Sequence, residues 1–125
     1  MSDTFAELYT PLLKDVFTAQ ARKEIDQGSD GLACARSYAE RGKPEFVLAY
    51  LLLIDQPEEV KRELLAHAYE QRAMLSEDKA EELDRRFHRP FPLIKLEAQK
   101  DRMAARQVRQ GKRVRTSTTK VPPVS

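Results

Sequence analysis

The sequence has no tryptophan, one cysteine and two histidines. A disulfide needs two cysteines, and a structural zinc ion needs about four sulfur or imidazole ligands. Cys34, His67 and His88 supply too few of either. We therefore expect no internal disulfide, no metal and no other cofactor, and a location in the reducing cytoplasm.

Long apolar runs are also missing. The longest, from Phe46 to Ile54, has nine residues, whereas a membrane-spanning helix needs about 20. This run predicts a buried helix, with a buried strand as the alternative. The first residues, MSDTFAEL, include acidic residues and no basic segment before an apolar stretch, which argues against a secretory signal.

The residues that are present favour a folded helical protein. Of the 125 residues, 41% are hydrophobic and 34% are charged, and the mean hydropathy is −0.62. This length suits one domain with a single modest core. Apolar residues keep helical spacing from Phe5 to Ile25 and predict a first core helix. Pro11 either follows an N-cap at Thr10 or kinks that helix.

Capping residues, glycines and prolines predict where the other helices begin and end. The expected boundaries are an N-cap at Asp30 for a short second helix ending at Gly42, a third helix opening at Pro44, a fourth at Pro57, a fifth capped by Ser76, and a last helix from about Pro92 to Gly111. The predicted fold class is all-α, with five to six helices packed as antiparallel hairpins in a small bundle or short solenoid. Residues 1–110 would form the helical domain and 111–125 a basic, extended tail.

Charge is distributed unevenly along the chain. From Glu97 onward there are eight basic residues and two acidic ones, a net charge of +6, which leaves −4 for the remainder of a chain whose total is +2. An acidic body joined to a basic end indicates either attraction between the two or a tail that binds an anionic partner.

The basic end supplies the candidate binding residues. Neutralisation of phosphates is one use for such a stretch, and the lack of aromatic residues there argues against base stacking. Membrane-surface binding is not expected, because no Trp, Phe or Leu cluster accompanies these charges. The candidates for contact with a nucleic acid or protein partner are Arg102, Arg106, Arg109, Lys112, Arg113 and Arg115. The alternative is a solvated helix end and tail that keep the protein soluble.

Two stretches, ACARSYAERG and LLAHAYEQRA, correspond at a shift of 31 positions, with Ala35 matching Ala66 and Tyr38 matching Tyr69. The first unit, SYAERGKPEFVLAYLLLID, resembles a tetratricopeptide-type helical hairpin, which implies binding of a partner peptide or protein. It departs from that family in lacking a Trp and in having Val47 where a small residue is expected. A chance match between unrelated helical hairpins is the alternative.

Arg62, His67 and Tyr69 stand in the Arg-x-x-x-x-His-x-Tyr order. This order resembles that of HEPN domains, small helical proteins of which many are metal-independent ribonucleases or toxins. The resemblance implies that Arg62 stabilises phosphate charge, that His67 assists attack by a ribose hydroxyl in a site shared across a dimer, and that Tyr69 is a modification site. Glu63 departs from the family pattern, and five steps along one helix separate Arg62 from His67 by about 140°. The alternative is a partly buried His67 with a hydrogen-bonded ring.

Two functions follow as hypotheses. The first is a non-catalytic helical interaction module, an adaptor whose basic C-terminal end contacts a nucleic acid or an acidic protein surface. The second is a HEPN-like metal-independent ribonuclease or toxin that uses Arg62 and His67. Under either hypothesis we expect no membrane partner, and a homo-oligomer is possible.

Overall fold

A computed structural model describes residues 8–112 and 114–118 of the chain. In these residues two strands enclose five helices in the order β1 (Leu8–Leu13), α1 (Asp15–Asp26), α2 (Gly31–Glu40), α3 (Pro44–Leu53), α4 (Glu58–Phe87), α5 (Pro92–Arg109) and β2 (Val114–Thr118). The predicted all-α class of antiparallel helical hairpins is confirmed. No helix of this described part is long and apolar enough to cross a membrane.

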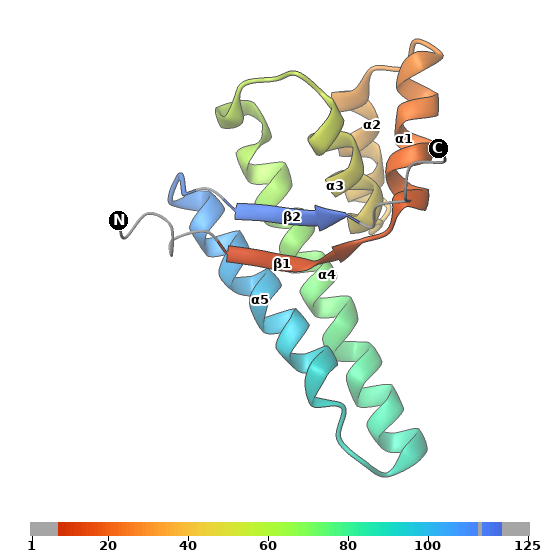
Figure 1. Cartoon of the computed structure of the whole chain (residues 1–125), viewed down its shortest axis with the longest axis vertical. Helices are drawn as coiled ribbons and strands as arrows, with labels where there is room; N and C mark the ends of the chain where they lie inside the picture. The colour runs from red at the N-terminus through yellow and green to blue at the C-terminus, as the bar shows by residue number, and fades with distance from the viewer. Residues whose placement is uncertain (1–7, 113, 119–125) are drawn as a thin grey trace, which may run out of the picture.

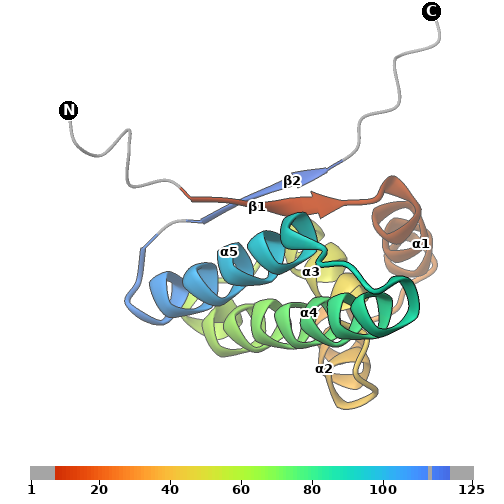
Figure 2. The ribbon, with the colours of Figure 1, turned by 90° about the horizontal axis from the view of Figure 1, so that it is seen from below.

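The long hairpin of α4 and α5 forms the spine of the molecule (Figure 1). Helices α2 and α3 contact α4, α1 packs on α3, and the two strands lie across α5 (Figures 1 and 2). The end of α4 and the start of α5 extend beyond all other elements (Figure 1). The hairpin therefore has a body half, covered by other elements, and a projecting half.

Several helix boundaries are those that the sequence predicts. The Asp30 carboxylate accepts hydrogen bonds from the backbone N–H groups of Leu32 and Ala33, at 3.1 and 3.4 Å, so it caps α2 as expected. Pro44 and Pro92 are the first residues of α3 and α5, where a missing N–H costs nothing.

Helix α3 is the centre of the core, which confirms the prediction of a buried helix for the long apolar run. Val47, Leu48 and Tyr50 are fully buried. Phe46 stacks on Tyr38 of α2, with ring centroids 4.6 Å apart, and meets Phe17 of α1 edge to face at 5.0 Å. Aromatic contacts thus join α3 to both preceding helices.

The prediction of separate fourth and fifth helices is wrong. Helix α4 is continuous over 30 residues, and Ser76 lies inside it rather than at its start. The reason is that no glycine or proline occurs between Glu58 and Phe87 to end the first helix. The two stretches that correspond at a shift of 31 positions consequently differ at their ends, because the first runs from α2 into the turn that follows it and the second lies wholly within α4.

The prediction of one helix from Phe5 to Ile25 is confirmed from Asp15, where α1 begins, and is wrong over residues 8–13. Residues 8–13 form β1, and Leu12 and Val16, expected in the core, are 55% and 64% exposed. Pro11 lies where the pairing register shifts, between Thr10 and Leu13, so the ladder needs no N–H from it.

Strand β2 pairs in parallel with β1, matching Leu8 with Val114 and Thr10 with Thr116. The sequence predicted an extended tail and no strands. The backbone beyond α5 is indeed extended over Val114–Thr118, but it is hydrogen-bonded to the N-terminal strand. Arg113 and residues 119–125 lie outside the described residues.

Candidate functional site

Opposite charges face each other along the contact between α4 and α5. The Arg109 guanidinium donates to both carboxylate oxygens of Glu70, at 2.7 and 2.9 Å. Arg102 pairs with Glu77, and its Nε lies 2.9 Å from a carboxylate oxygen. Moving seven residues along each of the two antiparallel helices leads from one pair to the next. The pairs therefore form a ladder between the helices, as charged residues flanking a coiled-coil seam do.

These contacts change the acidity of both partners. Hydrogen bonds from Arg109 and Arg102 lower the pKa values of Glu70 and Glu77, and the same bonds raise the pKa values of the two arginines. Attraction between the acidic body and the basic end, one of the two alternatives that the sequence left open, thus occurs within the fold. It occupies Arg102 and Arg109, which are two of the six candidate binding residues.

Arg106 and Lys112 are different. Both side chains are exposed, and neither makes an ion pair with any residue that the structure describes. Arg106 lies between Arg102 and Arg109 on the same side of α5, because steps of three and four residues return to one helix face. The backbone of Arg115 belongs to β2, and Arg113 is outside the described residues. The four candidates whose side chains the structure describes thus divide into a neutralised pair, Arg102 and Arg109, and an open pair, Arg106 and Lys112.

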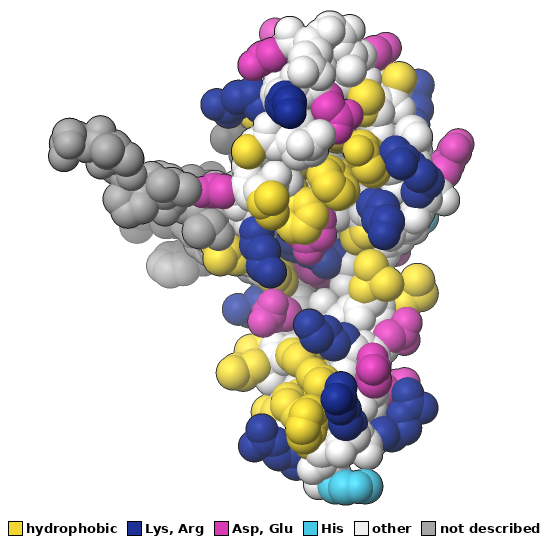
Figure 3. Space-filling model, turned by 90° about the vertical axis from the view of Figure 1, so that its right-hand side faces the viewer, with side chains coloured by type: hydrophobic (Ala, Val, Ile, Leu, Met, Phe, Trp, Pro, Cys, Tyr) yellow, Lys and Arg dark blue, Asp and Glu magenta, His cyan; other side chains and the backbone are white. Residues whose placement is uncertain are grey.

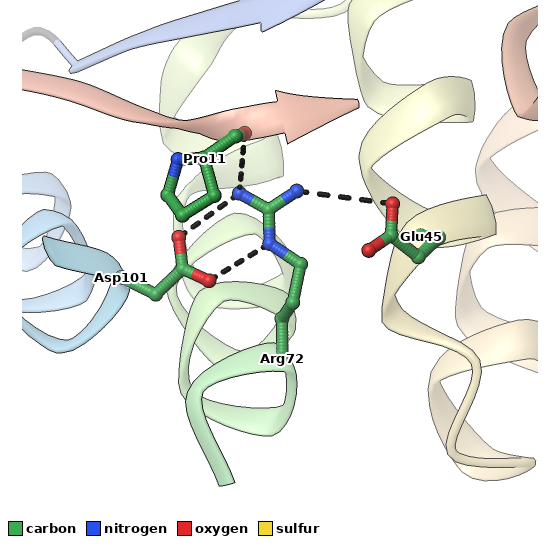
Figure 4. A network of polar contacts seen from close by, with 4 residues as sticks. All are labelled: Pro11, Glu45, Arg72 and Asp101. Atoms are coloured by element: carbon green, nitrogen blue, oxygen red, sulfur yellow. Dashed lines mark hydrogen bonds and ion pairs between the residues drawn. The ribbon is translucent and has the colours of Figure 1, made fainter. Parts of the chain in front are cut away.

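A buried ionic network, which no sequence pattern predicted, joins several elements of the fold (Figure 4). Arg72 of α4 is 5% exposed and donates to both carboxylate oxygens of Asp101 on α5, at 2.8 and 2.9 Å. Its Nη2 also donates to the carbonyl oxygen of Pro11 in β1 at 3.1 Å. Its Nη1 lies 3.8 Å from the Glu45 carboxylate of α3. One guanidinium therefore joins four elements.

The network holds one positive and two negative groups, of which Arg72 and Asp101 are buried and the Glu45 side chain is 32% exposed. Burial raises the pKa values of Glu45 and Asp101, and attraction to Arg72 opposes both rises. Asp101 is fully buried among alanines of α5, and a carboxylate on an apolar helix face is the signal that could have pointed to a buried partner. The role of the network is to hold α5 and β1 against α4.

The residues of the HEPN-like order lie on one uninterrupted helix. Tyr69 is fully buried, Arg62 is half-buried and His67 is exposed. About 140° of rotation separates Arg62 from His67, so the two side chains of one chain diverge. The alternative prediction of a partly buried His67 is wrong, because the opposite face of α4 carries the packing.

Cys34 is half-buried and free, and within the described residues no group of three or more His, Cys, Asp or Glu side chains could hold a metal ion. No protein-family model, no curated protein and no solved structure matches the chain. Any functional conclusion therefore depends on the residues of this chain alone.

Proposed function

We propose that the protein is a non-catalytic helical interaction module that binds an anionic partner, in the first place a nucleic acid, through the basic C-terminal end of α5. The observation that carries this proposal is the division of the candidate cations. Carboxylates of α4 neutralise Arg102 and Arg109, whereas Arg106 and Lys112 remain exposed and open to a partner.

The local sequence supports the same assignment. Residues 106–115, RQVRQGKRVR, contain five basic residues and no acidic one. Each phosphate of a nucleic acid that such residues neutralise releases a counterion, which favours binding at low salt. The stretch has no aromatic residue, so we expect contact with the phosphate backbone rather than recognition of bases.

Binding of labelled single-stranded RNA and duplex DNA, measured by fluorescence anisotropy over a series of salt concentrations, tests this proposal. Replacing Arg106 and Lys112 by glutamine should reduce the slope of log affinity against log salt by about two, because each phosphate contact contributes about one unit. A matched control is Arg22→Gln with Lys23→Gln, which removes the same charge from exposed positions of α1.

Point substitutions are preferable to deletion of the tail, because deletion beyond Gly111 also removes β2. Equal losses of affinity in the test and control variants would mean that only net charge matters and would contradict a localised site. If the full-length protein binds neither RNA nor DNA, the nucleic-acid proposal fails and an acidic protein surface becomes the candidate partner.

The HEPN-like ribonuclease or toxin is the second candidate, and the exposure of His67 favours it because an exposed imidazole can reach RNA. Arg62 and His67 diverge on α4, so a site would need one of them from each of two chains. The test is cleavage of single-stranded RNA without added metal. Because His67 is exposed, His67→Ala should not change the melting temperature, and loss of cleavage would assign the residue to catalysis.

A further inference from the structure

The end of the projecting half is a basic and apolar tip, defined here as residues 85–96. It contains four cationic side chains, Arg85, Arg86, Arg89 and Lys95, and no aspartate or glutamate. All of these cations are exposed, and none forms an ion pair within the described residues. The tip is therefore a patch of uncompensated positive charge at the opposite end of α5 from the C-terminal cations.

Large apolar side chains are exposed among these charges. Leu93 is 73% exposed, Phe87 53% and Leu96 46%. Leu93 and Leu96 lie three residues apart and so share one side of the first turn of α5. Single exposed apolar residues are ordinary on a protein surface, but a group of them surrounded by cations marks an interaction surface.

The tip projects away from the rest of the fold. Figure 1 shows the turn between α4 and α5 as the far end of the long hairpin, and Figure 3 shows apolar side chains interspersed with lysine and arginine over this end of the molecule. His88 reverses the chain there in the left-handed conformation, with φ of 56°. Phe87 and Phe91 meet across the turn with ring centroids 6.1 Å apart. A flat surface can reach this end without contact with α1, α2 or α3.

We propose that the tip binds the surface of an anionic lipid bilayer. Leu93, Leu96 and Phe87 would enter the boundary between head groups and acyl chains, and the four cations would contact anionic head groups. Only the tip enters the bilayer surface, and the helices do not cross it. The sequence-based expectation of no membrane partner was argued from the C-terminal cations, which lack apolar neighbours, whereas the tip combines cations with exposed apolar side chains.

A bilayer fits these residues better than a nucleic acid does. The Arg86 guanidinium lies over the Phe87 ring at 5.6 Å and that of Arg89 lies over Phe91 at 5.2 Å, so a stacking base would have to displace an arginine from the ring that it joins. Contact between exposed leucine side chains and phosphate or sugar contributes little binding free energy, whereas transfer of these side chains from water to acyl chains is favourable.

A single tryptophan makes the proposal directly measurable, because the natural sequence has none. Leu93→Trp places the probe at a 73% exposed tip position, and Val16→Trp places a control at a 64% exposed position on the body. With vesicles of phosphatidylcholine containing phosphatidylserine, emission of the tip probe should shift to shorter wavelength, and brominated acyl chains should quench it. The control probe should show neither effect, and vesicles of phosphatidylcholine alone should give much weaker binding.

Cosedimentation with the same vesicles separates charge from apolar contact. Arg86→Gln with Arg89→Gln should weaken binding roughly 25-fold, since each cation near an anionic surface contributes about fivefold. Leu93→Ser should also weaken it and leave the melting temperature unchanged. Arg106→Gln with Lys112→Gln, which changes the other end of α5, should weaken it far less.

Three results would overturn the proposal. One is the absence of vesicle binding by the full chain, and another is binding that Arg106→Gln with Lys112→Gln abolishes while the tip variants retain it. The third is a shift of the Leu93→Trp emission on addition of RNA but not of vesicles, which would assign the tip to nucleic acid instead.

Discussion

The body half and the projecting half of the α4–α5 hairpin have the same helix contact but different surroundings. Buried alanines line the contact in both halves, with Ala66 and Ala105 in the body and Ala80 and Ala98 in the projection. Small side chains let two helices approach closely wherever they occur. Only the body half is also covered by α3 and β1. The comparison shows that the alanines set the spacing of the helices, and that the covering elements determine which half exposes its outer surface.

The charged side chains of the two halves also differ in burial and in their partners. In the body half the Arg72 guanidinium is buried and shared by a carbonyl and two carboxylates. In the projecting half Arg86 and Arg89 are exposed and contact only aromatic rings. A buried charge requires partners whereas an exposed one does not. The body half therefore uses its charges to hold the fold, and the projecting half leaves them open to a partner.

The largest effect should come from breaking the buried network of the body half. Asp101→Leu leaves the Arg72 guanidinium buried without its bidentate partner and should lower the free energy of unfolding by about 3–5 kcal/mol. Urea denaturation followed by circular dichroism measures this loss. Arg86→Met, the matched change in the projecting half, should cost less than about 0.5 kcal/mol because that side chain is exposed.

The double variant Arg72→Met with Asp101→Leu is the control for this effect. It removes both charges and should recover most of the lost stability, because an apolar pair replaces an ion pair at little net cost. A double variant as unstable as Asp101→Leu alone would show that the hydrogen-bond geometry, not the unpaired charge, is what the fold requires.

The next largest effect concerns the alanine contact itself. Ala66→Phe should overpack the body half and lower the free energy of unfolding by about 1–3 kcal/mol. Ala80→Phe makes the same change in the projecting half, where fewer elements surround the helices, so they can separate and the cost should be smaller. Thermal and urea denaturation compare the two variants. Equal costs would mean that the projecting half is as rigid as the body.

A smaller effect should appear in the dependence of stability on pH. Burial raises the pKa of Glu45, so the folded state binds its proton more tightly than the unfolded state does. The stability that Glu45 contributes is therefore present at acidic pH. It falls as the pH rises through the interval between the pKa of Glu45 in the unfolded chain and its higher pKa in the folded protein. Glu45→Gln should remove that fall, and the difference between wild type and variant over a pH series isolates it. A difference that grows in favour of wild type as pH rises would contradict the assignment.

The smallest effect should come from the exposed ladder. A double-mutant cycle on Glu77 and Arg102 should give a coupling energy of about 0.2–1 kcal/mol, because both side chains are largely in water. This coupling should weaken at high salt. A coupling above this range that persists at high salt would place the ladder with the buried network instead.

The sequence was informative where the signal is local. Capping at Asp30 and the prolines at helix starts identify helix ends by chemistry within one turn, and they are confirmed. The apolar run in α3 likewise has a composition that only a core position accommodates. The cations of the basic end were recognised as a group because they are consecutive in the chain.

The errors concern features that depend on distant partners. Strand β1 forms because residues near the other end of the chain pair with it, and no local pattern records that pairing. The Arg72–Asp101 contact joins residues 29 positions apart. The net charge of the residues before Glu97 hides the tip, because the acidic residues of the body outnumber its four cations in that sum. Ser76 does not cap a helix, because no residue near it ends the preceding one.

The pairing of β1 with β2 also sets an order of events during synthesis. Leu8 leaves the ribosome before the helices do, whereas its partner Val114 emerges only after the five described helices have been made. At about 5–20 residues per second, the interval is on the order of 5–20 seconds. During this interval the nascent chain carries an unpaired strand, and Leu13, which is fully buried in the folded protein, is still exposed. Strand β1, made before the helices, is thus fixed in place only after them, and during this interval a chaperone or another unfolded chain has access to it.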